Sequence, residues 1–94
     1  MLEQRCVHVR ISGRVQGVSF RAWTQRRATS LGLSGWVRNL VSGDVEAVFC
    51  GQTEHVDAML SECRQGPRLA CVERVEVLGA TAPVSGPFRI RADA

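Results

Sequence analysis

The period of the hydrophobic pattern changes several times along the chain, and the order of these changes constrains the fold more than any other feature. Residues 6–12 alternate apolar and polar positions, which is typical of a strand with one buried face. From Ser19 the apolar residues recur every three or four positions, which predicts a helix with Ser19 at its N-cap and Gly32 just beyond its end. Strand patterns follow over 33–40 and 45–50, on either side of a turn.

The hydrophobic pattern of the second half of the chain also changes from a helical to a strand period. Thr53 is expected to cap a helix that ends at Gly66, and the alternation over 72–78 predicts another strand. Residues 88–91 form a short last strand, expected at an edge. The order strand–helix–strand–strand–helix–strand is that of an α+β, ferredoxin-like βαββαβ sandwich, with two helices on one face of an antiparallel sheet. At 94 residues we expect a single domain, residues 1–94.

The composition excludes several function classes. The net charge is only +3, which does not favour nucleic acid as a partner. All 12 cationic side chains are arginines, so a mechanism that requires a lysine is excluded. The longest apolar runs have four residues, as in 47–50, and the first residues lack the apolar segment of a secretory signal. We therefore expect a cytoplasmic monomer with no membrane partner.

The loop between the first predicted strand and helix is the candidate site. Its sequence, GRVQGVSFR over residues 13–21, brings two glycines and an arginine to a helix N-terminus. Consecutive N–H groups in such a loop form a concave anion-binding site, and the guanidinium of Arg21 can close it. The competing interpretation is a tight turn followed by a solvated arginine, and spacing alone leaves both open.

Two motifs resemble those of the acylphosphatase family. Residues 13–21 are similar to its signature, Gly-x-Val-Gln-Gly-Val-x-Phe-Arg, and GWVRNL over 35–40 followed by GDVE over 43–46 is similar to its second motif. Val41 and Ser42 stand where a Pro-Asp turn is common, a departure that affects only the tip of the hairpin. The resemblance spans nearly the whole chain and implies a ferredoxin-like fold, in agreement with the pattern above.

The resemblance also implies an activity and its residues. The expected reaction is hydrolysis of the carboxyl–phosphate bond of a small-molecule acyl phosphate, with no metal and no cofactor, and with inorganic phosphate as product and competitive inhibitor. By position, Arg21 corresponds to the phosphate-binding arginine and Asn39 to the asparagine that positions the attacking water. The backbone cradle corresponds to Val15, Gln16, Gly17, Val18, Ser19 and Phe20.

The residue types of the loop agree with this substrate class. Residues 13–21 contain no Asp, Glu, His or Cys, so there is no evident general acid or general base. A mixed anhydride needs neither, because its leaving group is a carboxylate with a pKa near 4. Phosphoryl transfer then depends mainly on positioning and on stabilisation of charge.

Other interpretations remain open. A non-catalytic domain of this fold that binds acyl phosphates or other anionic metabolites would use Arg21 and Asn39 equally well. RNA binding is disfavoured because the first and third strands present no aromatic residue on the open face. Ser19 is expected as an N-cap and not as a nucleophile. A zinc site of Cys6, Cys50, His8 and His55 is disfavoured because no pair has a recognised ligand spacing.

The parity of the strands places two cysteines opposite one another. Cys6 begins the first strand and Cys50 ends its antiparallel neighbour, both on the face away from the helices. This register also pairs residue 8 with 48 and Arg10 with Glu46, a favourable cross-strand pair. We expect proximity of the two sulfurs and a disulfide if the compartment permits oxidation. Cys63 and Cys71 are expected to be free thiols.

Overall fold

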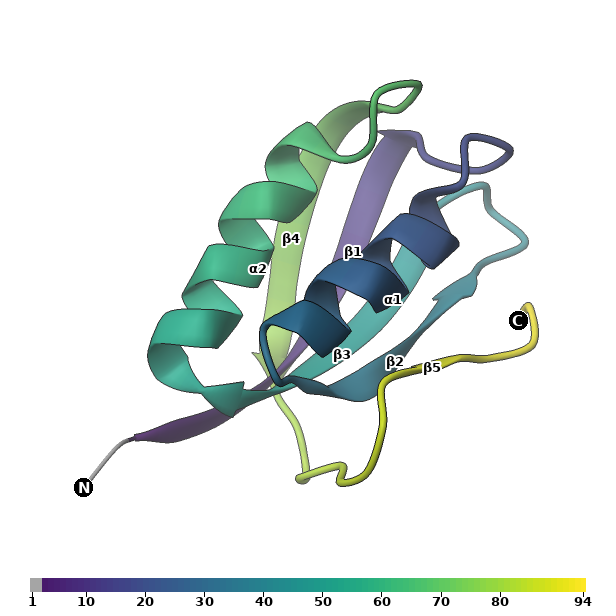
Figure 1. Ribbon diagram of the computed structural model, residues 1–94. Helices are drawn as coiled ribbons and strands as arrows, with labels where there is room; N and C mark the ends of the chain where they lie inside the picture. Colours follow the sequence, from purple (N-terminus) through teal and green to yellow (C-terminus); the bar gives the residue numbers. More distant parts are fainter. Residues whose placement is uncertain (1–2) are drawn as a thin grey trace.

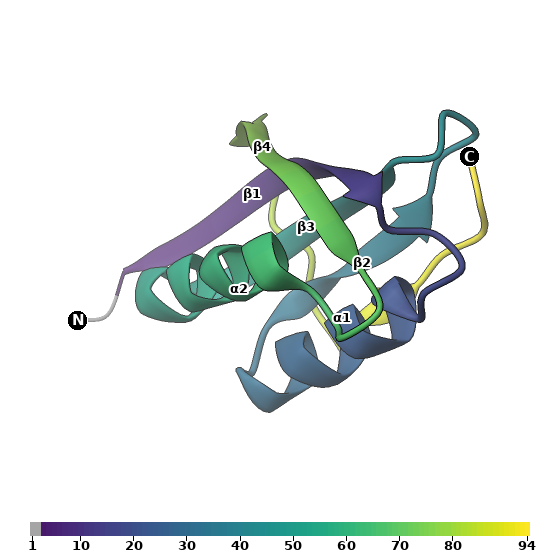
Figure 2. The ribbon, with the colours of Figure 1, turned by 90° about the horizontal axis from the view of Figure 1, so that it is seen from above.

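Two helices pack on one face of a five-stranded sheet, as the computed structural model, which describes residues 3–94, shows in Figure 1. Seen from above in Figure 2, both helices lie on the same side of the sheet, and the other face is open. This is the ferredoxin-like α+β fold expected from the hydrophobic pattern. The elements are β1 (Gln4–Arg14), α1 (Phe20–Ser30), β2 (Ser34–Asn39), β3 (Val45–Gln52), α2 (Thr53–Gln65), β4 (Cys71–Ala80) and β5 (Arg89–Ile90).

The strands lie in the order β4-β1-β3-β2-β5. The four long strands are antiparallel to their neighbours, but β5 runs parallel to β2, so the sheet is mixed and not purely antiparallel. The reason is the path of residues 81–88. This segment crosses from the β4 edge to the opposite edge and enters β5 at the end of the sheet where β2 begins (Figure 1).

The core lies between the sheet and the helices and follows the two periods of the sequence. The apolar set of β1 (Val7, Val9 and Ile11) is at most 2% exposed. The helices contribute side chains three and four positions apart, so each presents one stripe to the sheet. These buried helical residues are Phe20, Thr24 and Ala28 of α1 and Val56, Met59, Leu60 and Cys63 of α2.

The helix ends depart from the expected capping in two details. Ser19 is at the N-cap of α1, but its backbone is left-handed, with φ of 64°, and its side chain makes no capping hydrogen bond. Thr53 is the first residue of α2 and Gln52 is the N-cap, one position earlier than expected. The Thr53 N–H donates a hydrogen bond to the carbonyl of Glu3. This contact pairs one of the N–H groups at the start of α2 that a capping side chain would otherwise accept from. Gly32 follows α1 with φ of 72°, as its position predicted.

The register of β1 and β3 is confirmed, with residues 6, 8 and 10 opposite 50, 48 and 46. The expected Arg10–Glu46 ion pair is wrong despite this register. Glu46 instead contacts His8 and Arg38, each at 2.6 Å, and Arg10 donates from Nε to Asp44 Oδ2 at 2.6 Å. Because His8 and Arg38 already occupy the Glu46 carboxylate, Arg10 pairs with the carboxylate of Asp44 instead.

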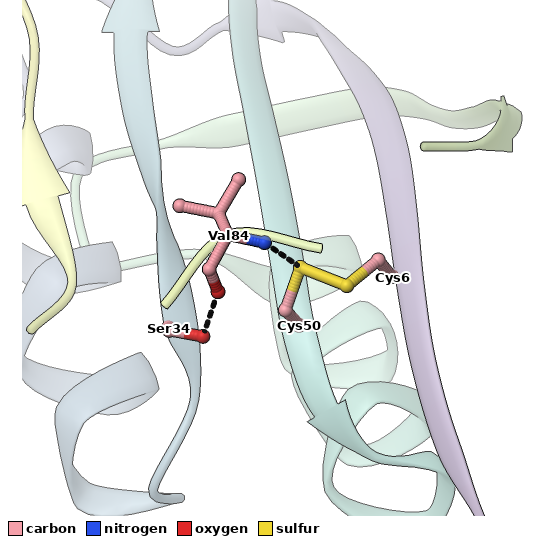
Figure 3. The surroundings of a disulfide bond; sticks show 4 residues. All are labelled: Cys6, Ser34, Cys50 and Val84. Atoms are coloured by element: carbon pink, nitrogen blue, oxygen red, sulfur yellow. Dashed lines mark hydrogen bonds between the residues drawn. A yellow bond between two sulfur atoms is a disulfide. The ribbon is translucent and has the colours of Figure 1, made fainter. Parts of the chain in front are cut away.

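A disulfide joins Cys6 to Cys50 on the open face, beneath residues 81–87, which we call the strap (Figure 3). The strap is held there by Val84: its N–H lies 3.4 Å from Cys50 Sγ, and its carbonyl accepts a hydrogen bond from Ser34 Oγ. Cys63 is a buried thiol and Cys71 an exposed one. Burial, together with the nearby Glu62 carboxylate, raises the pKa of Cys63 to about 12.

The open face of the sheet carries a tryptophan ring. Trp36 of β2 lies there, with the guanidinium carbons of Arg38 and Arg91 at 4.9 and 4.7 Å from its ring centroid. Because two cations already lie over it, the ring is not a free platform for stacking a base. Within residues 3–94, no helix is long and apolar enough to cross a membrane.

Candidate active site

Three segments far apart in the sequence meet at the end of the sheet opposite the disulfide. They are the β1–α1 loop, the hairpin between β2 and β3, and the last residues after β5, which all gather at one side of Figure 1. Between them is a hollow of about 420 Å³. It is lined by Val15, Gln16, Gly17, Ser19, Phe20, Arg21, Ala22, Asn39 and Ile90.

The backbone of the β1–α1 loop supplies unpaired donors to this hollow. Gly17 has φ of 73° and Ser19 has φ of 64°, so the chain turns twice through the left-handed region before α1 begins. Within the described part of the chain, none of the N–H groups of residues 15–20 donates to a protein acceptor. These N–H groups, together with the helix N-terminus, give the loop the character of an anion-binding nest.

Gln16 holds the loop against the hairpin. Its Nε2 donates to the carbonyl oxygens of Leu40 and Asp44, both at 2.8 Å. Leu40 and Asp44 are themselves paired, since the Leu40 N–H donates to the Asp44 carbonyl at 2.8 Å. The Gln16 side chain is therefore a positioning contact, and it brings the loop up to the strand end that carries Asn39.

Arg21 lies in the first turn of α1, with its guanidinium at the hollow. Its side chain is 38% exposed, and Nη1 lies 3.2 Å from Oδ1 of Asp93. This contact occupies one of the five N–H donors of the guanidinium. The other donors remain available for an anion in the nest, so Asp93 and a bound anion can share this arginine.

Asn39 is at the end of β2 and is 9% exposed. Its backbone carbonyl accepts from the Ala94 N–H at 3.0 Å, so the C-terminal segment is tied directly to this residue. Its side-chain Oδ1 is buried without a hydrogen-bond partner among the described residues. A buried amide oxygen without a partner is costly, and it marks a position where a small donor such as water would be bound.

The neighbouring Arg38 points the other way, as alternation along a strand requires. Its Nε donates to Glu46 on the open face. Burial disfavours the charge of Glu46, but hydrogen bonds and charge interactions with His8 and Arg38 outweigh it, so the pKa of this carboxyl is lowered. Arg38 therefore forms an ion pair with Glu46 on the open face of the sheet and does not face the hollow.

The hollow brings together nearly every residue that the sequence assigned to the site. Val18 is the exception: it does not line the hollow, and its side chain, 4% exposed, packs in the core. Sequence reasoning missed the contribution of the C-terminal segment, namely Ile90, Asp93 and Ala94. A weak strand and a polar tail carry no motif, and only the tertiary fold shows that they reach the site.

A larger hollow, of about 830 Å³, lies at the disulfide end between the strap and the sheet. Its walls include both disulfide cysteines, the backbone of several glycines, and Arg5, which is already paired with Asp57 at 2.5 Å. The smaller hollow is the better candidate for chemistry, because unpaired N–H groups, a guanidinium and an unpaired amide oxygen converge there.

Comparisons with known proteins give the same fold and the same class. The sequence profile of the acylphosphatase family matches residues 7–90. An acylphosphatase of Azorhizobium caulinodans is 54% identical over 87 residues, which covers 92% of this chain and 94% of that protein. The solved acylphosphatase of Coxiella burnetii aligns with a TM-score of 0.84 at 39% identity, over 94% of this chain and 93% of that one. The acylphosphatase of Bacillus subtilis aligns with a TM-score of 0.85 at 27% identity, over 95% and 99%.

The fold and the comparisons together define a small α+β hydrolase. With a family match over most of its length and relatives more than 50% identical, the chain belongs to the acylphosphatase family. The class of reaction is therefore hydrolysis of acyl phosphates, as the resemblance of its two motifs implied.

Proposed function

We propose that this protein hydrolyses acyl phosphates to a carboxylate and inorganic phosphate without a metal ion, with Arg21 binding the phosphoryl group and Asn39 positioning the water. The observation that carries the proposal is a convergence on one hollow. Residues 15–20 have unpaired N–H groups, and all of them except Val18 line the hollow together with Arg21 and Asn39, whose buried Oδ1 has no partner among the described residues.

The loop supplies the charge stabilisation. A phosphoryl group spreads negative charge over three oxygens as its bond to the acyl oxygen lengthens. Backbone donors that are already oriented require no reorganisation at that moment, so they stabilise the transition state more than flexible side chains would. Arg21 adds a planar pair of donors and a full positive charge.

Asn39 supplies the position of the nucleophile. Its Oδ1 accepts a hydrogen bond from the attacking water, which leaves the water lone pair directed at phosphorus. The amide is a weak base, so it orients the water and does not deprotonate it. The proton passes to a phosphate oxygen of the substrate as the phosphorus–oxygen bond to the water forms.

The leaving group completes the step without an acid. The bond between phosphorus and the acyl oxygen breaks, and its electron pair remains on the carboxylate. Because a carboxylate has a conjugate acid with a pKa near 4, it leaves unprotonated at neutral pH. The reaction thus yields carboxylate and phosphate from acyl phosphate and water, with atoms and charge balanced.

The test is release of phosphate from benzoyl phosphate by the purified protein, with and without EDTA. We expect turnover that EDTA does not change and that inorganic phosphate inhibits competitively. Loss of activity with EDTA would overturn the metal-free mechanism. Binding of phosphate without turnover would favour the alternative, a non-catalytic domain that binds anionic metabolites.

A further inference from the structure

We propose that two residues of the C-terminal segment select acyl phosphates whose acyl group is apolar and uncharged: Ile90, which lines the hollow, and Asp93, which is paired with Arg21 beside it. This inference rests on the proposed function and concerns the part of the substrate that the phosphate cradle does not bind. Neither residue lies in either of the two motifs, and both come from the segment after the strap.

The direction of attack determines where the acyl group lies. Displacement at phosphorus is in line, so the acyl oxygen leaves on the side opposite the attacking water. Asn39 is 9% exposed and forms the floor of the hollow, whereas Ile90 is 41% exposed and forms part of its mouth. A water held at the floor therefore directs the acyl group toward the mouth.

The mouth offers apolar surface on two facing elements. Val15 and Phe20 also line the hollow, but each is 1% exposed and packs in the core. Ile90 of β5 and the exposed Ala22 of α1 are the apolar side chains left to meet a substrate. Gln25 Nε2 of α1 donates a hydrogen bond at 3.2 Å to the carbonyl of Phe88, the residue just before β5. An exposed isoleucine is ordinary by itself, but one in the wall of a reaction site removes apolar substrate surface from water.

Asp93 places a negative charge beside the hollow. Its carboxylate lies 3.2 Å from Nη1 of Arg21, which lines the hollow, and its side chain is 63% exposed to solvent. The phosphoryl charge is met by the N–H groups of the loop and by the rest of the guanidinium. A second carboxylate carried on the acyl group has no such donors and is repelled by Asp93.

The experiment compares matched substrates within each variant. The ratio of kcat/KM between two substrates does not depend on how much protein is folded. It also cancels any shift of Arg21 that affects the phosphoryl group alone. Acetyl phosphate, benzoyl phosphate and 4-carboxybenzoyl phosphate differ only in the acyl group. Leu78→Ala on β4 is the control, since Leu78 is 48% exposed and lies at the opposite edge of the sheet.

We expect Ile90→Ala to lower kcat/KM for benzoyl phosphate about 5-fold relative to acetyl phosphate, because the aromatic group loses its apolar contact. Ile90→Val retains most of the preference, and the inhibition constant for inorganic phosphate is unchanged. Asp93→Asn is expected to raise kcat/KM for 4-carboxybenzoyl phosphate about 3-fold relative to benzoyl phosphate, and the gain shrinks at high salt.

The outcomes separate this inference from the proposed function. If the wild type hydrolyses these substrates but both ratios stay unchanged in the variants, Ile90 and Asp93 do not select the acyl group and the inference is wrong. If Ile90→Ala lowers kcat/KM equally for acetyl and benzoyl phosphate, Ile90 is only structural. If the wild type hydrolyses none of the substrates, the proposed function fails first, and this inference falls with it.

Discussion

The two ends of the sheet differ in whether their polar backbone groups have partners. At the end where β1 begins, Cys6 and Cys50 are joined, and both backbone groups of Val84 in the strap have partners (Figure 3). At the other end, the N–H groups of residues 15–20 lack acceptors among the described residues, and Ser19 is in a left-handed conformation. One end is closed by crosslinks, whereas the other keeps donors free around a hollow.

This difference indicates a division between stability and function. Unpaired donors and left-handed backbone cost free energy, and such features persist only where the surrounding structure holds them in place. The buried strands and the crosslinked end supply that support. Variants at the disulfide end should therefore change stability with little effect on turnover, and variants of Arg21 and Asn39 should change turnover with little effect on stability.

The largest expected effect is on stability, from removing the disulfide. The loop that it closes spans 44 positions, and such a crosslink contributes about 4 kcal/mol in the chain-entropy model. The double variant Cys6→Ala/Cys50→Ala should lower the free energy of unfolding by up to that amount in urea titrations, with kcat within about 2-fold. Cys71→Ser, which removes an exposed free thiol, is the matched control. A similar loss in the control, or a large loss of kcat in the double variant, would contradict the division.

The largest expected effect on activity is at Arg21. Arg21→Ala removes a positive charge and a planar pair of donors, and kcat/KM for benzoyl phosphate should fall by about 100-fold or more. Arg21→Lys should not restore it, because a point charge does not reproduce the planar geometry. Arg26→Ala, an exposed arginine on the same helix, is the control and should leave kcat/KM unchanged. Near-normal kinetics in Arg21→Ala would remove Arg21 from the site.

Asn39 should affect kcat without affecting phosphate binding. If Oδ1 positions the water, Asn39→Ala lowers kcat by about 100-fold, because a misplaced nucleophile costs that much. The inhibition constant of inorganic phosphate should stay within about 2-fold, since phosphate binds without the water. A parallel loss of phosphate affinity would mean that Asn39 contacts the anion or supports the loop instead.

The fold was predictable in large part because β1 and β2 each have one buried face. Shifting the register by one residue would turn that whole face to solvent, so parity alone placed Cys6 opposite Cys50. Parity did not predict which charges pair. Arg10 is opposite Glu46 in register, yet it pairs with Asp44, because Glu46 already contacts His8 and Arg38, which reach it from neighbouring strands.

The candidate site was predictable where contiguous motifs carry it and not where tertiary structure does. Arg21 and Asn39 were assigned to it because each lies in a long motif next to a strand or helix end. Asp93 and Ile90 were not, since their position near the hollow depends on the strap crossing the sheet and returning the chain beside β2. The missing side-chain cap at Ser19 was also unpredictable, because a serine before a helix usually caps it.

A smaller effect on stability is expected from Glu46, and it should depend on pH. The pKa of this carboxyl is lowered in the folded protein, so its ion pairs stabilise the fold at neutral pH, and this contribution is lost as pH falls below about 4. Glu46→Gln should lower the free energy of unfolding by about 1 kcal/mol at pH 7. The difference from wild type should shrink as titrations proceed to pH 3. Glu73→Gln, at an exposed position on β4, should show neither effect, and a constant difference across the pH range would contradict the ion-pair account.

The smallest expected effect is a gain of stability at Ser19. A left-handed backbone costs a residue other than glycine about 1 kcal/mol, and glycine removes that cost while adding freedom to the unfolded chain. Ser19→Gly should therefore raise the free energy of unfolding by about 0.5 kcal/mol, whereas Ser61→Gly within α2 should lower it by a similar amount. The side chain of Ser19 makes no capping bond and is not expected to act as a nucleophile, so kcat for benzoyl phosphate should stay within about 3-fold. Loss of stability in Ser19→Gly would show that the left-handed turn is not a cost at this end of the molecule. Loss of most of the activity would instead assign the hydroxyl a role in catalysis.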